Sequence, residues 1–281
     1  MTQTATPRSS DYVLGHADAE LRRLAEQSAF YSDLTEDAFR RAGIAPGMRV
    51  LDVGCGAGDV SLLAGSLVGP TGEVLGIDRS PDAVAAAGRR ADAAGVAHAR
   101  FAVSEIDTIA PTDAGSGFDA VVGRLVLLYQ PDPAAALRTL TRLVRPGGVV
   151  VFQEFDMRIA RSTPLVPTYQ WCCDRIIALY ERAGLEADMG SRLFGAFIRA
   201  GLPAPTMIGA ARVEGGADSY VYRYMAATMR SLLPMFERLA VATPSEVDID
   251  TLEVRMRAEA LESTSSLVLP MFVAAWARTS S

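Results

Sequence analysis

The sequence contains neither lysine nor asparagine, so all 27 of its basic residues are arginines. Without a lysine side chain, Schiff-base chemistry and the P-loop mode of holding nucleotide phosphates are excluded. The heavy use of alanine, glycine and arginine indicates a GC-rich bacterial genome rather than a biochemical need.

Three further shortages narrow the class of protein. The net charge is −6, so the chain lacks the basic footprint of a nucleic-acid-binding protein. Its three cysteines, Cys55, Cys172 and Cys173, give neither a disulfide framework nor the spacing of a metal site. The N-terminus has no signal-peptide core, and Arg124 interrupts the most hydrophobic stretch, 118–129. We therefore expect a cytoplasmic protein that binds neither a membrane nor a metal.

Strand-like and helix-like segments alternate through the first half of the chain. Short apolar runs predict buried strands at 49–53, 73–77, 100–103, 118–122 and 148–155. Helices are predicted between them at 58–68, 81–94 and 133–144. Ser80-Pro81 and Asp132-Pro133 open the last two with proline at the first helical position. This alternation predicts a doubly wound parallel α/β sheet.

The two flanks have a different rhythm. Before the first strand, apolar spacing predicts two amphipathic helices, at 18–30 and 35–42. After residue 155 the sequence predicts two helices, at 164–184 and 190–200, and then a strand at 205–214. A helix-rich insert at 217–262 and a last strand at 267–277 follow. We interpret 1–281 as one domain, with an N-terminal helical lid (1–45), a core (46–156) and a C-terminal half (157–281).

A glycine-rich turn follows the first predicted strand. Gly54, Gly56 and Gly58 form GxGxG, whereas the dinucleotide fingerprint GxGxxG requires a glycine at the position of Asp59. An acid at the start of the helix also opposes a pyrophosphate there, because it partly neutralises the positive helix end. The turn therefore favours a ligand without phosphates at this point.

Asp78 ends the second predicted strand, about 20 residues beyond the turn, where a carboxylate can bind both hydroxyls of a ribose. Alone, this residue fits NAD as well as S-adenosylmethionine (SAM). Together with the GxGxG turn, it favours SAM.

At this point the sequence resembles the class I SAM-dependent methyltransferases, and most of all the small-molecule, type-11-like enzymes of bacterial metabolism. The resemblance is carried by the ordered segments VLDVGCGAGD, GEVLGIDRSPDAV, FAVSEIDTI, FDAVVGRLVLLYQPDPAAAL and LVRPGGVVVFQEFD. It covers 48–156 closely and the rest loosely. It implies a Rossmann-like sheet of seven strands with the last strand antiparallel, added helices that form a substrate cap, and SAM as cofactor.

The resemblance also implies cofactor contacts. The glycine backbone would approach the methionine and ribose, Asp78 the ribose diol, and Glu105 the adenine, although Ser-Glu-Ile replaces the family's Gly-Asp-Ala. Arg124 is atypical at its position, and its side chain either pairs with the SAM carboxylate or forms an ordinary ion pair. The implied cofactor residues are Tyr12, Gly54, Cys55, Gly56, Asp78, Arg79, Glu105, Ile106, Arg124 and Leu125.

Three residues are candidate general bases. His16 precedes the first predicted helix, in a segment that closes over SAM in related enzymes; a capping or exposed histidine is the alternative. Glu154 and Asp156 lie at the carboxyl end of the fifth strand, where open α/β sheets bind ligands. Either acid could act as base, bind a cationic substrate or cap the next segment. His98 lies at the opposite edge and is interpreted as structural.

The acceptor is expected to bind among the added helices. Tyr220, Tyr224 and Met225 can share one face of a helix at 219–236, and Tyr169 and Trp171 could line the opposite wall. The alternative for 219–236 is an ordinary core helix or the contact of a homodimer.

We predict methyl transfer to a small molecule, at the oxygen of an aromatic or natural-product-like metabolite of secondary metabolism. The alternatives are a carbon or nitrogen acceptor, a SAM-binding cyclase or rearrangement catalyst, and a non-catalytic SAM-binding dimer. A nicotinamide dehydrogenase is disfavoured by Asp59.

Overall fold

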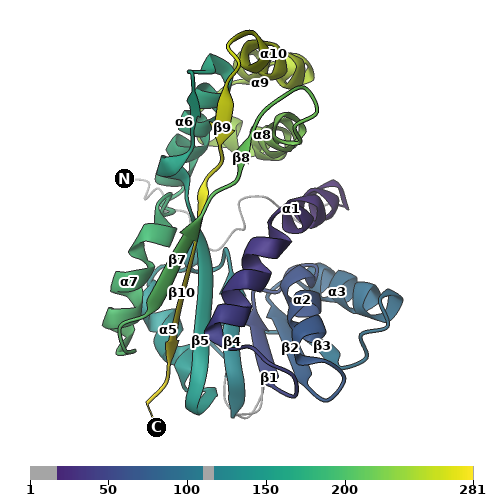
Figure 1. The fold of residues 1–281 in the computed structure, drawn as a ribbon, viewed down its shortest axis with the longest axis vertical. Helices are drawn as coiled ribbons and strands as arrows, with labels where there is room; N and C mark the ends of the chain where they lie inside the picture. The colour runs from purple at the N-terminus through teal and green to yellow at the C-terminus, as the bar shows by residue number, and fades with distance from the viewer. Residues whose placement is uncertain (1–17, 110–116, 281) are drawn as a thin grey trace, which may run out of the picture.

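The structure, a computed structural model, describes residues 18–109 and 117–280. Seven strands form one sheet in the order β3-β2-β1-β4-β5-β10-β7 (Figure 1). The strands are β1 (Arg49–Val53), β2 (Glu73–Asp78), β3 (Ala99–Val103), β4 (Phe118–Arg124), β5 (Val144–Asp156), β7 (Thr206–Ala210) and β10 (Met271–Arg278). β10 runs antiparallel to both β5 and β7, and β1 to β5 pair in parallel. The predicted doubly wound, Rossmann-like sheet with an antiparallel last strand is confirmed.

The helices of the core begin where the sequence predicts them. They are α2 (Asp59–Val68), α3 (Pro81–Ala93) and α5 (Pro133–Thr141). The Ser80 side chain accepts a hydrogen bond from the Ala83 amide at 3.3 Å, and Asp132 accepts two from the first turn of α5. These side chains bind amides that have no partner within the helix, which fixes each starting point.

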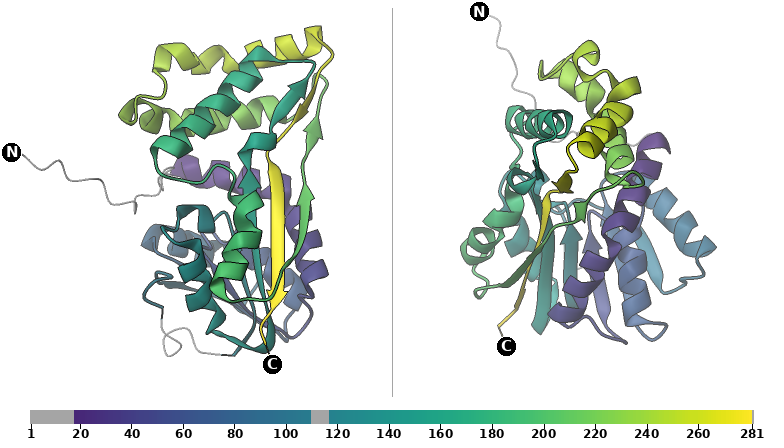
Figure 2. Two further views of the ribbon diagram at one scale, coloured as in Figure 1. Left: turned by 90° about the vertical axis from the view of Figure 1, so that its left-hand side faces the viewer. Right: turned by 45° about the horizontal axis from the view of Figure 1, so that its top comes forward.

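Helices cover both faces of the sheet (Figure 2). α1 (Asp18–Ala42) and α2 pack on one face, where Phe39 and Ala64 meet Val50 and Val122. α5 and α7 (Met189–Ala200) contact each other on the opposite face. The sheet is thus buried on both sides, which explains the continuous apolar runs of its central strands.

The remaining helices form a cap beyond the carboxyl ends of the parallel strands (Figures 1 and 2). The cap consists of α6 (Pro167–Arg182), α8 (Val221–Arg238), α9 (Pro244–Val247), α10 (Ile249–Glu262) and a small sheet of β6 (Arg161–Thr163), β9 (Ser266–Val268) and β8 (Val213–Glu214). α8, α9 and α10 lie within 217–262, where the sequence predicts a helix-rich insert.

The prediction of two N-terminal helices is wrong, because α1 is continuous from Asp18 to Ala42. No glycine or proline interrupts 31–34. The Thr35 hydroxyl, which could have capped a second helix, donates back to the Tyr31 carbonyl at 3.3 Å, as threonine does inside a helix.

The two strands predicted in the C-terminal half each divide between the two sheets. The run at 205–214 becomes β7 and β8, and the run at 267–277 becomes β9 and β10. Pro270 separates the second pair, since proline has no N–H for a strand ladder. β6, β8 and β9 have two or three residues each, too few to show a periodic pattern.

Aromatic side chains join α1, the core and the cap. Six rings lie in contact, with neighbouring centroids between 4.4 and 6.2 Å apart. They belong to Phe30, Tyr31, Phe155, Tyr220, Tyr224 and Phe272. We call this group the aromatic junction.

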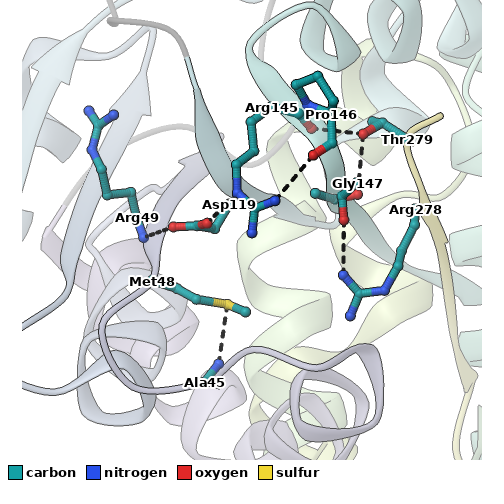
Figure 3. A network of polar contacts seen from close by, with 10 residues as sticks. Ala45, Met48, Arg49, Asp119, Arg145, Pro146, Gly147, Arg278 and Thr279 are labelled. Carbon is teal, nitrogen blue, oxygen red and sulfur yellow. Dashed lines mark hydrogen bonds and ion pairs between the residues drawn. The ribbon is translucent and has the colours of Figure 1, made fainter. Parts of the chain in front are cut away.

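The two edges of the sheet have different contents. We call the ends of β1, β2, β4 and β5, at Val53, Asp78, Arg124 and Asp156, the carboxyl edge, which faces the cap. The opposite, amino edge is joined by a polar network around Asp119 and Arg145 (Figure 3). Within the described ranges, no helix combines the length and the apolar character needed to cross a membrane.

Candidate functional site

The glycine turn after β1 has a backbone that only glycine adopts easily. Gly54, Gly56 and Gly58 all have left-handed φ angles, of 64°, 52° and 86°. A Cβ atom on Gly54 would lie 2.6 Å from the Val126 side chain, whereas one on Gly56 would meet nothing within 4 Å. The turn thus packs against the segment after β4 and leaves bare backbone beside open space at Gly56.

Gly58 provides the close packing beneath the turn. A Cβ there would lie 3.0 Å from that of Ala87 in α3. The adjacent Asp59 pairs with Arg90 at 2.6 Å, and Arg90 also donates to the Ala57 carbonyl at 2.7 Å. Because Arg90 offsets the charge of Asp59, repulsion of a pyrophosphate is a weaker argument than the sequence alone indicates.

Asp78 lies next to the glycine turn, as predicted. One carboxylate oxygen accepts from the Gly56 amide at 2.9 Å, and the other accepts from the Ser80 amide at 2.9 Å. These bonds fix the carboxylate between the turn and the start of α3. The side chain stays half-exposed, and each oxygen has a second lone pair for another donor.

The predicted adenine residues lie along the adjacent part of the carboxyl edge. Arg79 and Glu105 are exposed and Ile106 is half-buried. Val103, which pairs with Asp78 across β2 and β3, is 55% exposed and was not predicted. An exposed valine at a strand end beside Asp78 offers an apolar surface that composition alone could not reveal.

A buried polar cluster lies below the glycine turn on the α1 face. The Asp52 carboxyl accepts from the Ser61 hydroxyl at 2.6 Å, and Arg124 donates to the Thr35 hydroxyl at 3.2 Å. Burial raises the pKa of Asp52 to about 7, although the Ser61 hydrogen bond and the charge of Arg124 both lower it. Arg124 thus contacts α1, which the sequence did not predict. No sequence pattern around Ser61 or Thr35 indicates that these residues bind Asp52 and Arg124.

The segment after β4 is bound by the end of β5. Leu125 has a left-handed φ of 57°, unusual for a leucine, and its amide donates to the Gln153 carbonyl at 2.9 Å. The next amides, of Val126 and Leu127, donate to one oxygen of Glu154 at 2.9 and 2.7 Å. Glu154 is fully buried, and burial raises the pKa of its carboxyl to about 8.

The Asp156 carboxylate accepts hydrogen bonds from the segment that follows β5 and from α7. It accepts from the Arg158 amide at 3.0 Å, at the start of the 3-10 helix Met157–Ile159, and from the Ser191 hydroxyl of α7. Of the three roles considered for this acid, the contacts present are those of a cap.

The residues predicted to bind the methyl acceptor lie in two places, around the start of α8 and on α6. Tyr220 and Tyr224 belong to the aromatic junction, and Met225 is buried beside them on α8. Tyr169 is buried in α6 and donates to the Val268 carbonyl at 2.9 Å. Trp171 is half-buried on the same helix, with the Arg175 guanidinium 5.8 Å from its ring centroid.

Tyr12 and His16 lie outside the described residues. Cys55 is buried, its amide donates to the Ile77 carbonyl at 2.9 Å, and burial raises the pKa of its thiol well above the usual range, so it is no nucleophile. His98 lies 3.0 Å from the Gly65 carbonyl of α2, in keeping with a structural role. In the part of the chain that the structure describes, no three His, Cys, Asp or Glu side chains gather as metal ligands.

Comparison with known proteins identifies the core. Residues 44–187 match the family model of the methyltransferase domain. An arsenite methyltransferase of Aquipseudomonas alcaligenes is 34% identical over 121 residues, which are 41% of this chain and 35% of that protein. A ubiquinone biosynthesis O-methyltransferase of Paracidovorax citrulli is 37% identical over 116 residues, 41% of this chain and 47% of that protein.

The fold extends beyond this matched core. The structure of a geranyl diphosphate methyltransferase in complex with SAM has a TM-score of 0.52 to this chain at 18% identity, covering 94% of this chain and 93% of that one. By contrast, the sequence match spans only about a third to a half of the two curated relatives. The family model thus covers 44–187, whereas the likeness in fold extends over nearly the whole chain.

Proposed function

The chain belongs to the methyltransferase domain family, whose cofactor is SAM, and we propose that it transfers the SAM methyl group to a small-molecule acceptor. The observation that carries this proposal is the Asp78 carboxylate bound to the Gly56 amide at 2.9 Å. It joins the glycine turn to the acid that would bind the ribose.

The residues of the carboxyl edge fit SAM. The left-handed glycine backbone and the open space at Gly56 allow close approach of a ligand, and Asp78 would hold the ribose diol. Arg79, Glu105 and Ile106 would lie at the adenine, and Arg124 and the Leu125 backbone at the methionine end. SAM bears a sulfonium and an ammonium, and the half-exposed carboxylate of Asp78 would place negative charge nearby.

We place the acceptor between the carboxyl edge and the cap. Tyr220, Tyr224 and Met225 would form its apolar wall. Tyr169 and Trp171 would form a second, more distant one. In the aromatic junction, Tyr31 of α1 contacts both Tyr224 of α8 and the rings at the ends of β5 and β10, and an aromatic or natural-product-like acceptor would suit these rings. An oxygen acceptor is supported by the ubiquinone O-methyltransferase relative.

SAM supplies an activated methyl group, so the chain's own residues mainly orient the reactants and exclude water. The cap helices α6, α8 and α10 lie beyond the carboxyl edge and would serve the second purpose (Figure 1). A hydroxyl acceptor also needs a base, for which His16 remains the predicted residue, because Glu154 is fully buried and both oxygens of Asp156 accept hydrogen bonds within the protein.

The first experiment is calorimetric titration of ligand-depleted protein with S-adenosylhomocysteine and with NAD. We expect micromolar binding of the first ligand alone, weakened about tenfold or more (about 1.4 kcal/mol) in Asp78→Ala. Asp92→Ala, which removes an exposed acid of α3, is the matched control and should bind like the wild type.

Binding of NAD, or no binding of S-adenosylhomocysteine by the wild type, would refute the cofactor site. Methyl-labelled SAM is then used to screen phenols, amines and trivalent arsenic as acceptors. Labelled phenol ethers would support the oxygen acceptor, and label in the other products would replace it.

A further inference from the structure

Glu154 is buried at the carboxyl edge, and no described residue forms an ion pair with it. Its side chain is fully buried, and the causes of its raised pKa are burial opposed by three backbone amides of 126–128, with no charged residue among them. Burying an acid in this way is unfavourable unless the site uses its oxygens.

One oxygen of Glu154, at the end of β5, accepts hydrogen bonds from two consecutive amides of the segment that follows β4. Val126 and Leu127 donate to it at 2.9 and 2.7 Å, at the start of the 3-10 helix Leu127–Tyr129. The first amides of a helix have no partner within it, so this carboxyl group replaces a local cap. Glu154 and Val126 are 28 positions apart, and the bond therefore ties β5 to the segment after β4.

The same segment touches the glycine turn. The Val126 side chain lies 2.6 Å from the position that a Cβ of Gly54 would occupy. A contact path thus runs from Glu154 through the Val126 amide and side chain to Gly54. Leu125, held in its left-handed conformation, directly precedes Val126.

The other oxygen of Glu154 argues against a role as base. It is buried and has no hydrogen-bond partner among the described residues. Solvent does not reach this oxygen when no acceptor is bound. It therefore cannot take a proton from an acceptor unless the site rearranges.

We propose that Glu154 is a positioning residue, whose carboxyl group holds Val126 against Gly54 and thereby sets the affinity of the glycine turn for SAM. This inference rests on the proposed function, because it assumes that the turn binds SAM. Its raised pKa keeps the group largely protonated at neutral pH, so glutamine is a close mimic in charge and shape.

The test measures S-adenosylhomocysteine binding to Glu154→Gln and Glu154→Met. Glutamine retains the accepting oxygen, whereas methionine keeps the length of the side chain but removes the oxygen. We expect a dissociation constant within about twofold of the wild type for glutamine, and about tenfold weaker binding (about 1.4 kcal/mol) for methionine. Exchange of the Val126 and Leu127 amide hydrogens should accelerate only in Glu154→Met.

Asp119→Ala is the matched control, because Asp119 also binds a backbone amide, that of Arg49, but at the amino edge. It should lower the unfolding midpoint and leave the dissociation constant unchanged. Val126→Ala tests the same contact path from its other end and should weaken binding, also if Glu154→Met does not fold.

Several results would overturn the inference. Equal losses in Glu154→Gln and Glu154→Met would assign the effect to the carboxyl charge. Unchanged binding in Glu154→Met or in Val126→Ala would show that the contacts from Glu154 through Val126 to Gly54 do not affect the affinity. If the wild type binds and Asp78→Ala weakens binding, these outcomes reject the inference alone; if the wild type does not bind, the proposed function fails first.

Discussion

The amino and carboxyl edges of the same sheet treat their carboxyl groups in opposite ways. At the amino edge, Asp119 accepts from the Arg49 amide and the Arg145 guanidinium at 2.8 and 2.6 Å, and these partners hold its pKa below the usual range (Figure 3). At the carboxyl edge, burial raises the pKa of Asp52 to about 7 and that of Glu154 to about 8.

Backbone conformation adds a further difference. Left-handed glycines occur at both edges, but the carboxyl edge also has a left-handed leucine at Leu125. Strain and desolvation of this kind gather at functional sites and are sustained by stability elsewhere. The amino edge thus carries paired carboxylates that stabilise the sheet, whereas the carboxyl edge carries buried acids and strained backbone at some cost in stability, as the proposed ligand site would require.

The largest effect is expected from Gly54→Ala. Its Cβ would combine a left-handed φ of 64° with a 2.6 Å approach to Val126. We expect a loss of about 2–4 kcal/mol in the free energy of unfolding, measured by urea titration, and loss of calorimetric S-adenosylhomocysteine binding.

Gly147→Ala is the control at the amino edge. Gly147 has a left-handed φ of 74°, but the nearest atom to an added Cβ is 3.9 Å away. This variant should lose about 1–2 kcal/mol from backbone strain alone and bind normally. Equal binding by both variants would erase the distinction between the two edges.

The second prediction concerns pH. The pKa of Glu154 is raised in the folded state, so between about pH 5 and 8 the unfolded chain releases a proton that the folded chain retains. Stability should therefore fall as the pH rises through this window, by about 3 kcal/mol for each buried carboxyl. Asp52 acts in the same direction. Urea midpoints from pH 5 to 8 should show a shallower fall in Glu154→Gln than in the wild type.

Asp119 provides the opposite sign. Its pKa is lowered, so its contribution is present at neutral pH and is lost only as the pH falls through the acid range. Asp119→Asn should leave the slope between pH 5 and 8 unchanged. A slope that is identical in wild type and Glu154→Gln would show that Glu154 does not carry the predicted difference.

Most of the core could be predicted because its signals are local. Buried parallel strands appear as apolar runs, and the caps at Ser80 and Asp132 stand directly before their helices. The family resemblance over 48–156 added the number of strands in the sheet and its antiparallel last strand. The small sheet of the cap has strands of two or three residues and leaves no pattern.

The parts of the site that depend on local sequence patterns could also be predicted. The glycine turn and Asp78 have a characteristic spacing, and the structure brings them together. The bond between Glu154 and Val126 depends on register between β4 and β5, which sequence alone cannot supply. Burial also separates Tyr169 from Trp171, although both lie on one predicted helix.

The smallest expected effect lies between α1 and the carboxyl edge. Thr35→Val removes the hydroxyl that accepts from Arg124 at 3.2 Å, while the guanidinium and its charge stay in place. Because one hydrogen bond contributes about 1 kcal/mol or less, S-adenosylhomocysteine should bind only about two- to threefold more weakly. Thr279→Val removes a comparable bond at the amino edge, to the Arg145 carbonyl at 2.8 Å, and should leave binding unchanged. Calorimetry on both variants compares the edges at the scale of single hydrogen bonds. If Thr279→Val weakens binding as much as Thr35→Val does, the effect comes from general loosening of the sheet, and the placement of Arg124 at the methionine end loses this support.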